Sequence, residues 1–194
     1  MNSIKSRFRG FLPIVVDIET GGLNPKTDSI LEISIVFLKF RKNEIYIHDV
    51  DHYHIKPACN TNVFKKALYY NKILPNHPFR LAVEEKVALD SIYSRVFDII
   101  KHEKCIKAIL VGHNAWFDLS FLIAASKRTK IKNIPFHNFS SIDTATLSIL
   151  SYGQTVLSQA LNAAKIKFDN SKAHSALYDS IKTAQLFCKI VNKF

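Results

Sequence analysis

A hydrophobic stretch near the start of the chain predicts a buried β-strand over residues 12–19. Residues 14–16 are consecutive Ile, Val and Val, which is typical of a strand covered on both faces. A second strand is expected over residues 30–40, where apolar residues recur at every second position, and a third over residues 45–55. Short polar turns join these strands, so we expect neighbouring strands to run antiparallel.

Beyond residue 61 the hydrophobic positions recur mostly at helical spacing. The predicted helices cover residues 62–71, 81–104, 115–126, 144–151, 155–164 and 174–192. Two short strands are expected between them, at residues 108–111 and 141–143. The strand at 108–111 follows a helical crossover and can therefore lie parallel to the first strand. Residues 1–11 show no periodicity and are expected to form an exposed basic tail.

This order of elements predicts one domain that spans residues 1–194. The fold class is α/β, with a mixed β-sheet flanked by α-helices in an arrangement similar to that of ribonuclease H. The first three strands of this sheet are expected to be antiparallel and the later strands parallel. A chain of this length can bury a full hydrophobic core.

The balance of charge points to a polyanionic partner. The chain has 27 Lys+Arg against 16 Asp+Glu, a formal net charge of +11, which favours binding to nucleic acid or to an anionic membrane surface. Since 21 of the basic residues are lysine, compositional drift in an AT-rich genome is an alternative source of this charge. No apolar run approaches the roughly 20 residues of a transmembrane helix. The three cysteines lack C-x-x-C spacing and no secretory signal is visible, so we expect a cytoplasmic protein with reduced thiols.

Asp17 and Glu19 form the first acidic centre, at the end of the first predicted strand. Because they are two residues apart in a strand, their side chains leave the same face, roughly 6–7 Å apart. Two such charges at the edge of an apolar strand favour a divalent metal between them, and oxygen ligands favour Mg²⁺ or Mn²⁺. The alternative is structural: one carboxylate caps the turn at residues 21–22 and the other is solvated.

Asp118 is the second acidic centre and lies about one turn into a predicted helix. Gly112 permits a tight turn after the preceding strand, and Asn114 is suited to cap the helix. For Asp118 alone, a favourable interaction with the helix dipole is the structural alternative to metal binding. His113 is expected to hydrogen-bond the loop rather than to bind metal.

His174 and Asp179 form the third centre. Five residues correspond to about 500° of helical rotation, so the two side chains would diverge within one ideal helix. We therefore expect His174 on the loop before the helix and Asp179 on the helix. A mobile imidazole beside an acidic metal site suits a general base, whereas a capping or solvated role is the alternative.

One further pair of potential ligands, His52 and His54, lies two residues apart on the third predicted strand. Such a pair can bind a metal only with additional ligands. No third ligand lies nearby in the sequence, so we expect exposed strand residues here.

Together, the three acidic centres resemble the DEDDh family of 3′→5′ exonucleases, whose motifs contain Asp-x-Glu, Asp and His-x-x-x-x-Asp. All three motifs occur in the required order. Further stretches extend the resemblance, toward an RNA-trimming branch of that family, over nearly the whole chain. These stretches are residues 7–11, 133–137, 153–158, 173–179 and 187–192.

The resemblance implies a Mg²⁺-dependent 3′→5′ exoribonuclease. Four carboxylates would hold two Mg²⁺ ions, or Mn²⁺ in their place: Asp17, Glu19, Asp118 and Asp179. His174 would be the general base, and nucleoside 5′-monophosphates would be released. The implied substrates are short single-stranded 3′ ends of stable RNAs, including the CCA end of tRNA and rRNA precursors, with single-stranded DNA as a further substrate.

The same resemblance implies residues that hold the substrate. Tyr70, Phe117 and Phe139 match positions that stack on the terminal bases, although spacing alone leaves a core role open for both phenylalanines. Leu23 stands at an aromatic position, where it can wedge but not stack, and Lys66 stands at an acidic one. These two departures put fine base discrimination in doubt. A basic patch would bind substrate across a homodimer, and its members are Arg7, Arg9, Lys101, Lys107 and Lys132.

Two alternatives to an RNA-trimming enzyme remain open. A proofreading-type 3′→5′ DNA exonuclease would use the same chemistry on another substrate. A non-catalytic RNA-binding protein could have the same fold and charge. It would not need all five polar residues of the site, and all five are present.

Overall fold

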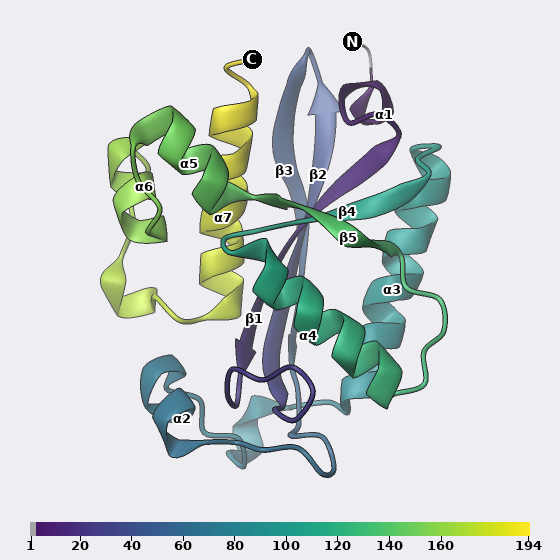
Figure 1. Ribbon diagram of the computed structural model, residues 1–194, viewed down its shortest axis with the longest axis vertical. Helices are drawn as coiled ribbons and strands as arrows, with labels where there is room; N and C mark the ends of the chain where they lie inside the picture. The colour runs from purple at the N-terminus through teal and green to yellow at the C-terminus, as the bar shows by residue number, and fades with distance from the viewer. Residues whose placement is uncertain (1–2) are drawn as a thin grey trace.

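A five-stranded sheet with β1 at its centre organises the chain in this computed structural model, which describes residues 3–194. The strand order is β3-β2-β1-β4-β5 (Figure 1). Neighbours among the first three strands are antiparallel, whereas β1–β4 and β4–β5 are parallel. This arrangement confirms the predicted mixed sheet. The strands are β1 (Phe11–Thr20), β2 (Ile30–Arg41), β3 (Glu44–His54), β4 (Lys107–Gly112) and β5 (Phe136–Asp143).

Helices flank the sheet: α7 packs across β1, β2 and β3, while α4 contacts β1, β4 and β5. In Figure 1, α5, α6 and α7 lie to the left of the sheet and α3 to its right. Within residues 3–194, no helix combines the length and the apolar content needed to cross a membrane. The helices are α1 (Ile4–Arg7), α2 (Lys65–Asn71), α3 (Glu85–His102), α4 (Ala115–Arg128), α5 (Thr144–Tyr152), α6 (Leu157–Ala163) and α7 (Ala176–Val191), with 3₁₀ turns at Pro78–Arg80 and Asn170–Lys172.

The central strand β1 is buried on both faces, as its unbroken hydrophobic run predicts. Ile14, Val15 and Val16 are completely shielded from solvent, and so are Leu110 and Val111 in the neighbouring strand β4. This apolar packing is the main stabilising contribution of the strand, at about 25 cal/mol for each Å² of apolar surface removed from water. Polar residues at the end of β1 therefore begin where a dry core ends.

Several boundaries differ from the sequence-based expectation. The helix expected over residues 81–104 begins at Glu85, because Leu81 adopts a left-handed backbone conformation with φ of 50° after a 3₁₀ turn. The strand expected over residues 141–143 begins at Phe136 and pairs with β4. Its polar composition hides it from a hydrophobic pattern, because most of its side chains face solvent or lie only half-buried.

The N-terminal segment is folded rather than an exposed tail, as far as the described residues 3–11 are concerned. Ile4 is buried at 1% exposure, and the Phe8 ring stacks on Phe187 of α7 with centroids 6.1 Å apart. The guanidinium of Arg7 donates to the carbonyl of Val191. Phe8 is therefore half-buried against α7.

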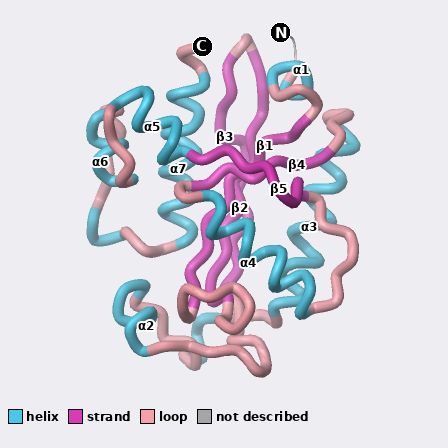
Figure 2. Tube along the Cα trace, viewed as in Figure 1, coloured by secondary structure: helices cyan, strands magenta, loops and turns pink. Residues whose placement is uncertain are grey.

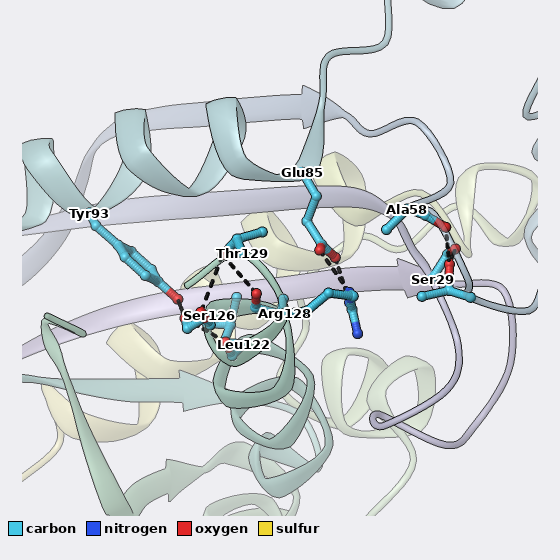
Figure 3. A network of polar contacts seen from close by, with 10 residues as sticks. Ser29, Ala58, Glu85, Tyr93, Leu122, Ser126, Arg128 and Thr129 are labelled. Atoms are coloured by element: carbon cyan, nitrogen blue, oxygen red, sulfur yellow. Dashed lines mark hydrogen bonds and ion pairs between the residues drawn. The ribbon is translucent and has the colours of Figure 1, made fainter. Parts of the chain in front are cut away.

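A polar network ties α3 to α4 (Figure 3). Arg128 donates to both carboxylate oxygens of Glu85, at 2.9 and 2.6 Å. Tyr93 Oη and Ser126 Oγ lie 2.8 Å apart. A paired, bidentate arrangement offsets the cost of burying Glu85, which is 4% exposed.

Loops gather around α2 at the end of the sheet toward which β1 points (Figure 2). The loop after β1 is held there by backbone bonds: Phe64 donates to the carbonyl of Gly21 at 2.8 Å, and Ser29 donates to that of Asn62 at 3.1 Å. These contacts place segments from different parts of the chain around the end of β1.

Candidate active site

Asp17 and Glu19 lie at the end of β1, one on each side of the buried Ile18. Both are half-buried and leave the same face of the strand, as predicted. The backbone N–H of Gly21 donates to the carbonyl of Ser29 at 2.8 Å, and within residues 3–194 no hydrogen bond joins either carboxylate to the turn at residues 21–22. The expectation that one of them caps this turn is therefore wrong.

Asp118 reaches this pair through the parallel pairing of β1 with β4. The register joins Val15 to Val111, so the chain after β4 turns into α4 beside the end of β1. Asp118, 3% exposed, accepts the backbone N–H of Ile18 on its Oδ1 at 3.1 Å. Its carboxylate is thus held at Ile18, the residue between Asp17 and Glu19.

The cap of α4 differs from the expectation. Asn114 is left-handed, with φ of 65°, and its side chain makes no capping bond. Instead, Asp143 at the end of β5 accepts the backbone N–H groups of Asn114 and Ala115, at 3.2 and 3.1 Å, and also that of Ala145. Sequence reasoning missed Asp143, although an acid directly before an apolar helical run is a recognisable cap signal. His113 bonds Thr144 and the carbonyl of Thr155, as expected.

His174 and Asp179 occupy the predicted places before and within the last helix, since α7 begins at Ala176. His174 is exposed and left-handed, with φ of 65°, which is uncommon for a residue other than glycine. Its backbone N–H donates to Asp179 Oδ2 at 2.8 Å. Ligand atoms of Glu19, His174 and Asp179 all lie within 4.8 Å of one another.

The four carboxylates form one acidic cluster in which charge is strongly disfavoured. Burial is the largest cause that raises each pKa, and neighbouring acids add to it. The pKa of Glu19 rises to about 8, and so does that of Asp118. The pKa of Asp17 is raised well above its usual range, with the charge of Asp118 as the second cause, and the pKa of Asp179 is raised as well. Among the described residues, Asp179 Oδ1 is buried without a hydrogen-bond partner.

Because these pKa values are raised, we expect the free energy of unfolding to depend on both pH and bound metal. Carboxyl groups with raised pKa hold protons in the folded state that the unfolded chain releases, so metal-free stability should fall as pH rises from about 4.5 to about 8, at ~1.4 kcal/mol per pH unit for each proton. A bound cation would replace those protons. Mg²⁺ should therefore raise the melting temperature more at pH 8 than at pH 5.5, measured against EDTA at each pH. An equal increase at both pH values would contradict this cluster as the binding site.

The residues expected to stack on bases differ in exposure. Phe139 is 93% exposed, Leu23 83% and Tyr70 56%, so all three present side chains to solvent. Phe117 is half-buried next to Asp118 and packs against Phe121, with ring centroids 4.9 Å apart. The exposure of Phe139 excludes a core role for that residue, whereas Phe117 has one face in the core.

Helix α2, which carries Tyr70, is fastened to the end of β1 by Asn71. Asn71 is buried, and its side-chain amide donates to the carbonyl of Thr20 at 3.1 Å and also hydrogen-bonds Glu19. Sequence reasoning missed Asn71, because one isolated asparagine in a predicted helix gives no sign of a contact with another strand.

Only some of the five basic residues expected to bind substrate have exposed side chains. Lys107 and Lys132 line a common surface cavity of 280 Å³, beside Phe97. Arg7 is half-buried, and its guanidinium already bonds the carbonyl of Val191. The exposed members are Arg9, Lys101 and Lys132.

The expectation for His52 and His54 is wrong in two respects. Both are half-buried rather than exposed, and a third potential ligand, Glu32, lies beside them on β2. The register pairs Glu32 with His54, although 22 residues separate them in the chain. Antiparallel pairing brings these residues together, which a search for ligands close in sequence cannot detect.

Comparison with known proteins gives consistent matches. A family model described as an exonuclease, RNase_T, matches residues 14–187. The chain is 52% identical over 194 residues to ribonuclease T of Wigglesworthia glossinidia brevipalpis, covering 100% of this chain and 90% of that protein. It is 50% identical to ribonuclease T of Vibrio campbellii, covering 99% and 91%.

Solved structures share the fold. A structure of a 3′-exonuclease that recognises the 3′ end of a histone mRNA stem-loop superposes with a TM-score of 0.73 at 18% identity, covering 94% of this chain and 83% of that one. The nuclease domain of 3′hExo, a DEDDh family member bound to rAMP, gives 0.69 at 20% identity, covering 93% and 92%. These matches confirm the ribonuclease H-like fold and the resemblance to DEDDh exonucleases.

Proposed function

Because the chain belongs to the ribonuclease T family of exonucleases and is a 3′→5′ exoribonuclease, we propose that it trims short single-stranded 3′ ends of tRNA, turning over the CCA end, and of other stable RNAs such as rRNA precursors. One observation supports this most: three distant segments bring Asp17, Glu19, Asp118 and Asp179 together beside His174. Such a cluster suits cleavage of a phosphodiester only when its own charge is neutralised.

The residues present fit a pair of Mg²⁺ ions. Four carboxylates with raised pKa, one of which has an unpartnered buried oxygen, form an oxygen-only site that favours a hard divalent cation. The ligands that we propose are Asp17, Glu19, Asp118 and Asp179. Bound Mg²⁺ supplies Lewis acidity, which lowers the pKa of a water nucleophile and stabilises charge on the leaving 3′ oxygen.

We assign the general base to His174. Its side chain is exposed and so can contact a water at the 3′-terminal phosphodiester, where a ring nitrogen takes the proton of the attacking water. Asp179 fixes the backbone of His174 through the 2.8 Å bond from the His174 N–H. The orientation of the base is thus tied to a ligand of the metal site.

We propose that exposed aromatic residues hold the last nucleotides of the RNA. Phe139 and Tyr70 offer free ring faces, and Phe117 offers the face that does not pack on Phe121. Base–aromatic stacking contributes about 1–3 kcal/mol per base and tolerates any sequence. Leu23 can wedge against a base but cannot stack on it.

We further propose a homodimer in the cytoplasm, in which the basic patch binds the RNA backbone. The apolar surface formed by Leu150 of α5 and Phe194, which are 82% and 92% exposed, supports such an assembly. These two residues line one cavity of 340 Å³ together with Phe8. The exposed Arg9, Lys101 and Lys132 are free to contact phosphates.

The test compares two matched substrates that share one duplex stem and differ only in an RNA or a DNA 3′ overhang. In Mg²⁺ we expect the RNA overhang to shorten faster, with nucleoside 5′-monophosphates released and the stem left intact. EDTA should stop the reaction, and tRNA should lose its CCA end. Faster shortening of the DNA overhang would favour the proofreading-type alternative, and binding without shortening would favour the non-catalytic one.

A further inference from the structure

Glu32 of β2 is a buried carboxylate next to the acidic cluster that belongs to none of the three motifs. It is 4% exposed and lies opposite Glu19 in the β1–β2 register. Burying a fifth acid beside four others costs several kcal/mol unless hydrogen bonds or charges compensate. The hydrogen-bond partners of Glu32 should therefore show what compensates for its burial.

Two of those partners lie in the sheet and at the start of α7. His52 Nε2 lies 2.6 Å from Glu32 Oε1, and Ser175 Oγ donates to the same oxygen at 3.5 Å. Burial alone would raise the pKa of Glu32, but the hydrogen bond and charge of His52 lower it below its usual value. Glu32 is thus the one acid among these five whose surroundings favour its charged form.

The backbone N–H of Ala176, next to Ser175, is also directed at the Glu32 carboxylate and helps to lower its pKa. Ala176 is the first residue of α7, and Ser175, its N-cap, makes no side-chain capping bond of its own. The first N–H groups of a helix have no partner within the helix, and a carboxylate there is also favoured by the helix dipole. Glu32 therefore caps α7 from a different element of the fold.

This cap lies between two residues of the active site. His174 is two residues before Ala176, and Asp179 is in the first turn of α7. We propose that Glu32, held by His52, is a positioning residue for the exonuclease reaction: it fixes the start of α7 and thereby the places of His174 and Asp179.

Glu32, His52 and His54 could instead be considered as the ligands of a second metal ion. Their potential ligand atoms lie within 4.8 Å of one another. However, His52 Nε2 already bonds the carboxylate, and the guanidinium of Arg80 is close enough to interact with Glu32 by its charge. A hydrogen-bonded pair beside a cation leaves no net negative charge to attract a metal.

The inference rests on the exonuclease activity and is tested by Glu32→Ala and Glu32→Gln. Alanine removes the cap, so kcat should fall about 10- to 100-fold while KM changes little, because small misplacements of reacting groups reduce turnover steeply. Glutamine keeps an acceptor for Ala176, and its NH₂ group can donate to a ring nitrogen of His52. We therefore expect Glu32→Gln to recover most of the lost kcat. His52→Leu removes the hydrogen bond that holds Glu32 and should therefore also lower kcat.

Glu85→Ala is the matched control, because Glu85 is equally buried and is bonded to Arg128 between α3 and α4 (Figure 3). It should lower the melting temperature yet leave kcat of the folded enzyme unchanged. Unchanged kcat in Glu32→Ala, or a Glu32→Gln variant as slow as Glu32→Ala, would overturn the positioning role. So would a full recovery of Glu32→Ala at higher Mg²⁺, which would make Glu32 a metal ligand. An inactive wild-type protein would instead count against the proposed function.

Discussion

Replacing Asp17 by asparagine is expected to abolish hydrolysis while the protein remains folded. The side chain keeps its shape but loses the charge that faces Asp118 across the end of β1. With one of four carboxylates gone, we expect kcat on an RNA overhang in Mg²⁺ to fall by at least about 10³-fold, the scale of losing a central group of a metal-assisted mechanism. Single-turnover rates of wild type and variant at saturating protein measure this difference.

The same substitution should stabilise the metal-free fold, because the raised pKa of Asp17 means that folding must either protonate this carboxyl or bury its charge, and asparagine removes that cost. The melting temperature in EDTA at pH 8 should therefore rise, and its increase with Mg²⁺ should shrink. Asp90→Asn is a suitable control, since Asp90 is an exposed partner of Lys86 on α3. Turnover by Asp17→Asn near the wild-type rate would remove Asp17 from the metal site.

Replacing His174 is expected to reduce turnover about 10²- to 10⁴-fold while RNA affinity changes little, as for loss of a general base. Alanine and glycine variants should both be made, because the left-handed backbone of His174 suits glycine and strains alanine. If the imidazole is what matters, both variants lose kcat to a similar extent. Imidazole added to the buffer should then restore part of the rate in the glycine variant, where the missing ring leaves space.

His102→Ala serves as the control for a histidine outside the site, since the His102 side chain is 81% exposed at the end of α3. A glycine variant of His174 with normal turnover would show that the backbone conformation matters and the ring does not. RNA affinity that falls in parallel with kcat would instead assign His174 to substrate binding.

The hydrophobic pattern predicted the sheet because each strand is encoded by a short stretch of consecutive residues. The apolar run of residues 14–16 is covered by helices on both sides, and the polar turns between the first three strands allow only antiparallel neighbours. Asp118 and Asp179 could be placed for the same reason: each follows a recognisable start of a helix. The motifs therefore located the acidic cluster before any contact was known.

Contacts between distant segments could not be predicted in this way. The cap that Asp143 provides for α4 and the cap that Glu32 provides for α7 both depend on which strand lies beside which helix. Strand β5 was predicted too short because its polar side chains give no alternating apolar signal. The pairing of Glu32 with His54 likewise follows from sheet register alone.

The separation of the acidic residues along the chain has a consequence for synthesis. Ile18 and Asp118, which are hydrogen-bonded, are 100 residues apart, and the Ser34–Ser180 bond that fastens α7 to β2 spans 146. At translation rates of about 5–20 residues per second, roughly 5–20 s pass between the synthesis of Ile18 and that of Asp118. A chain on the ribosome cannot assemble the cluster until α7 has left the exit tunnel. The acidic cluster can therefore form only after Asp179, the last of its members along the chain, has been synthesised.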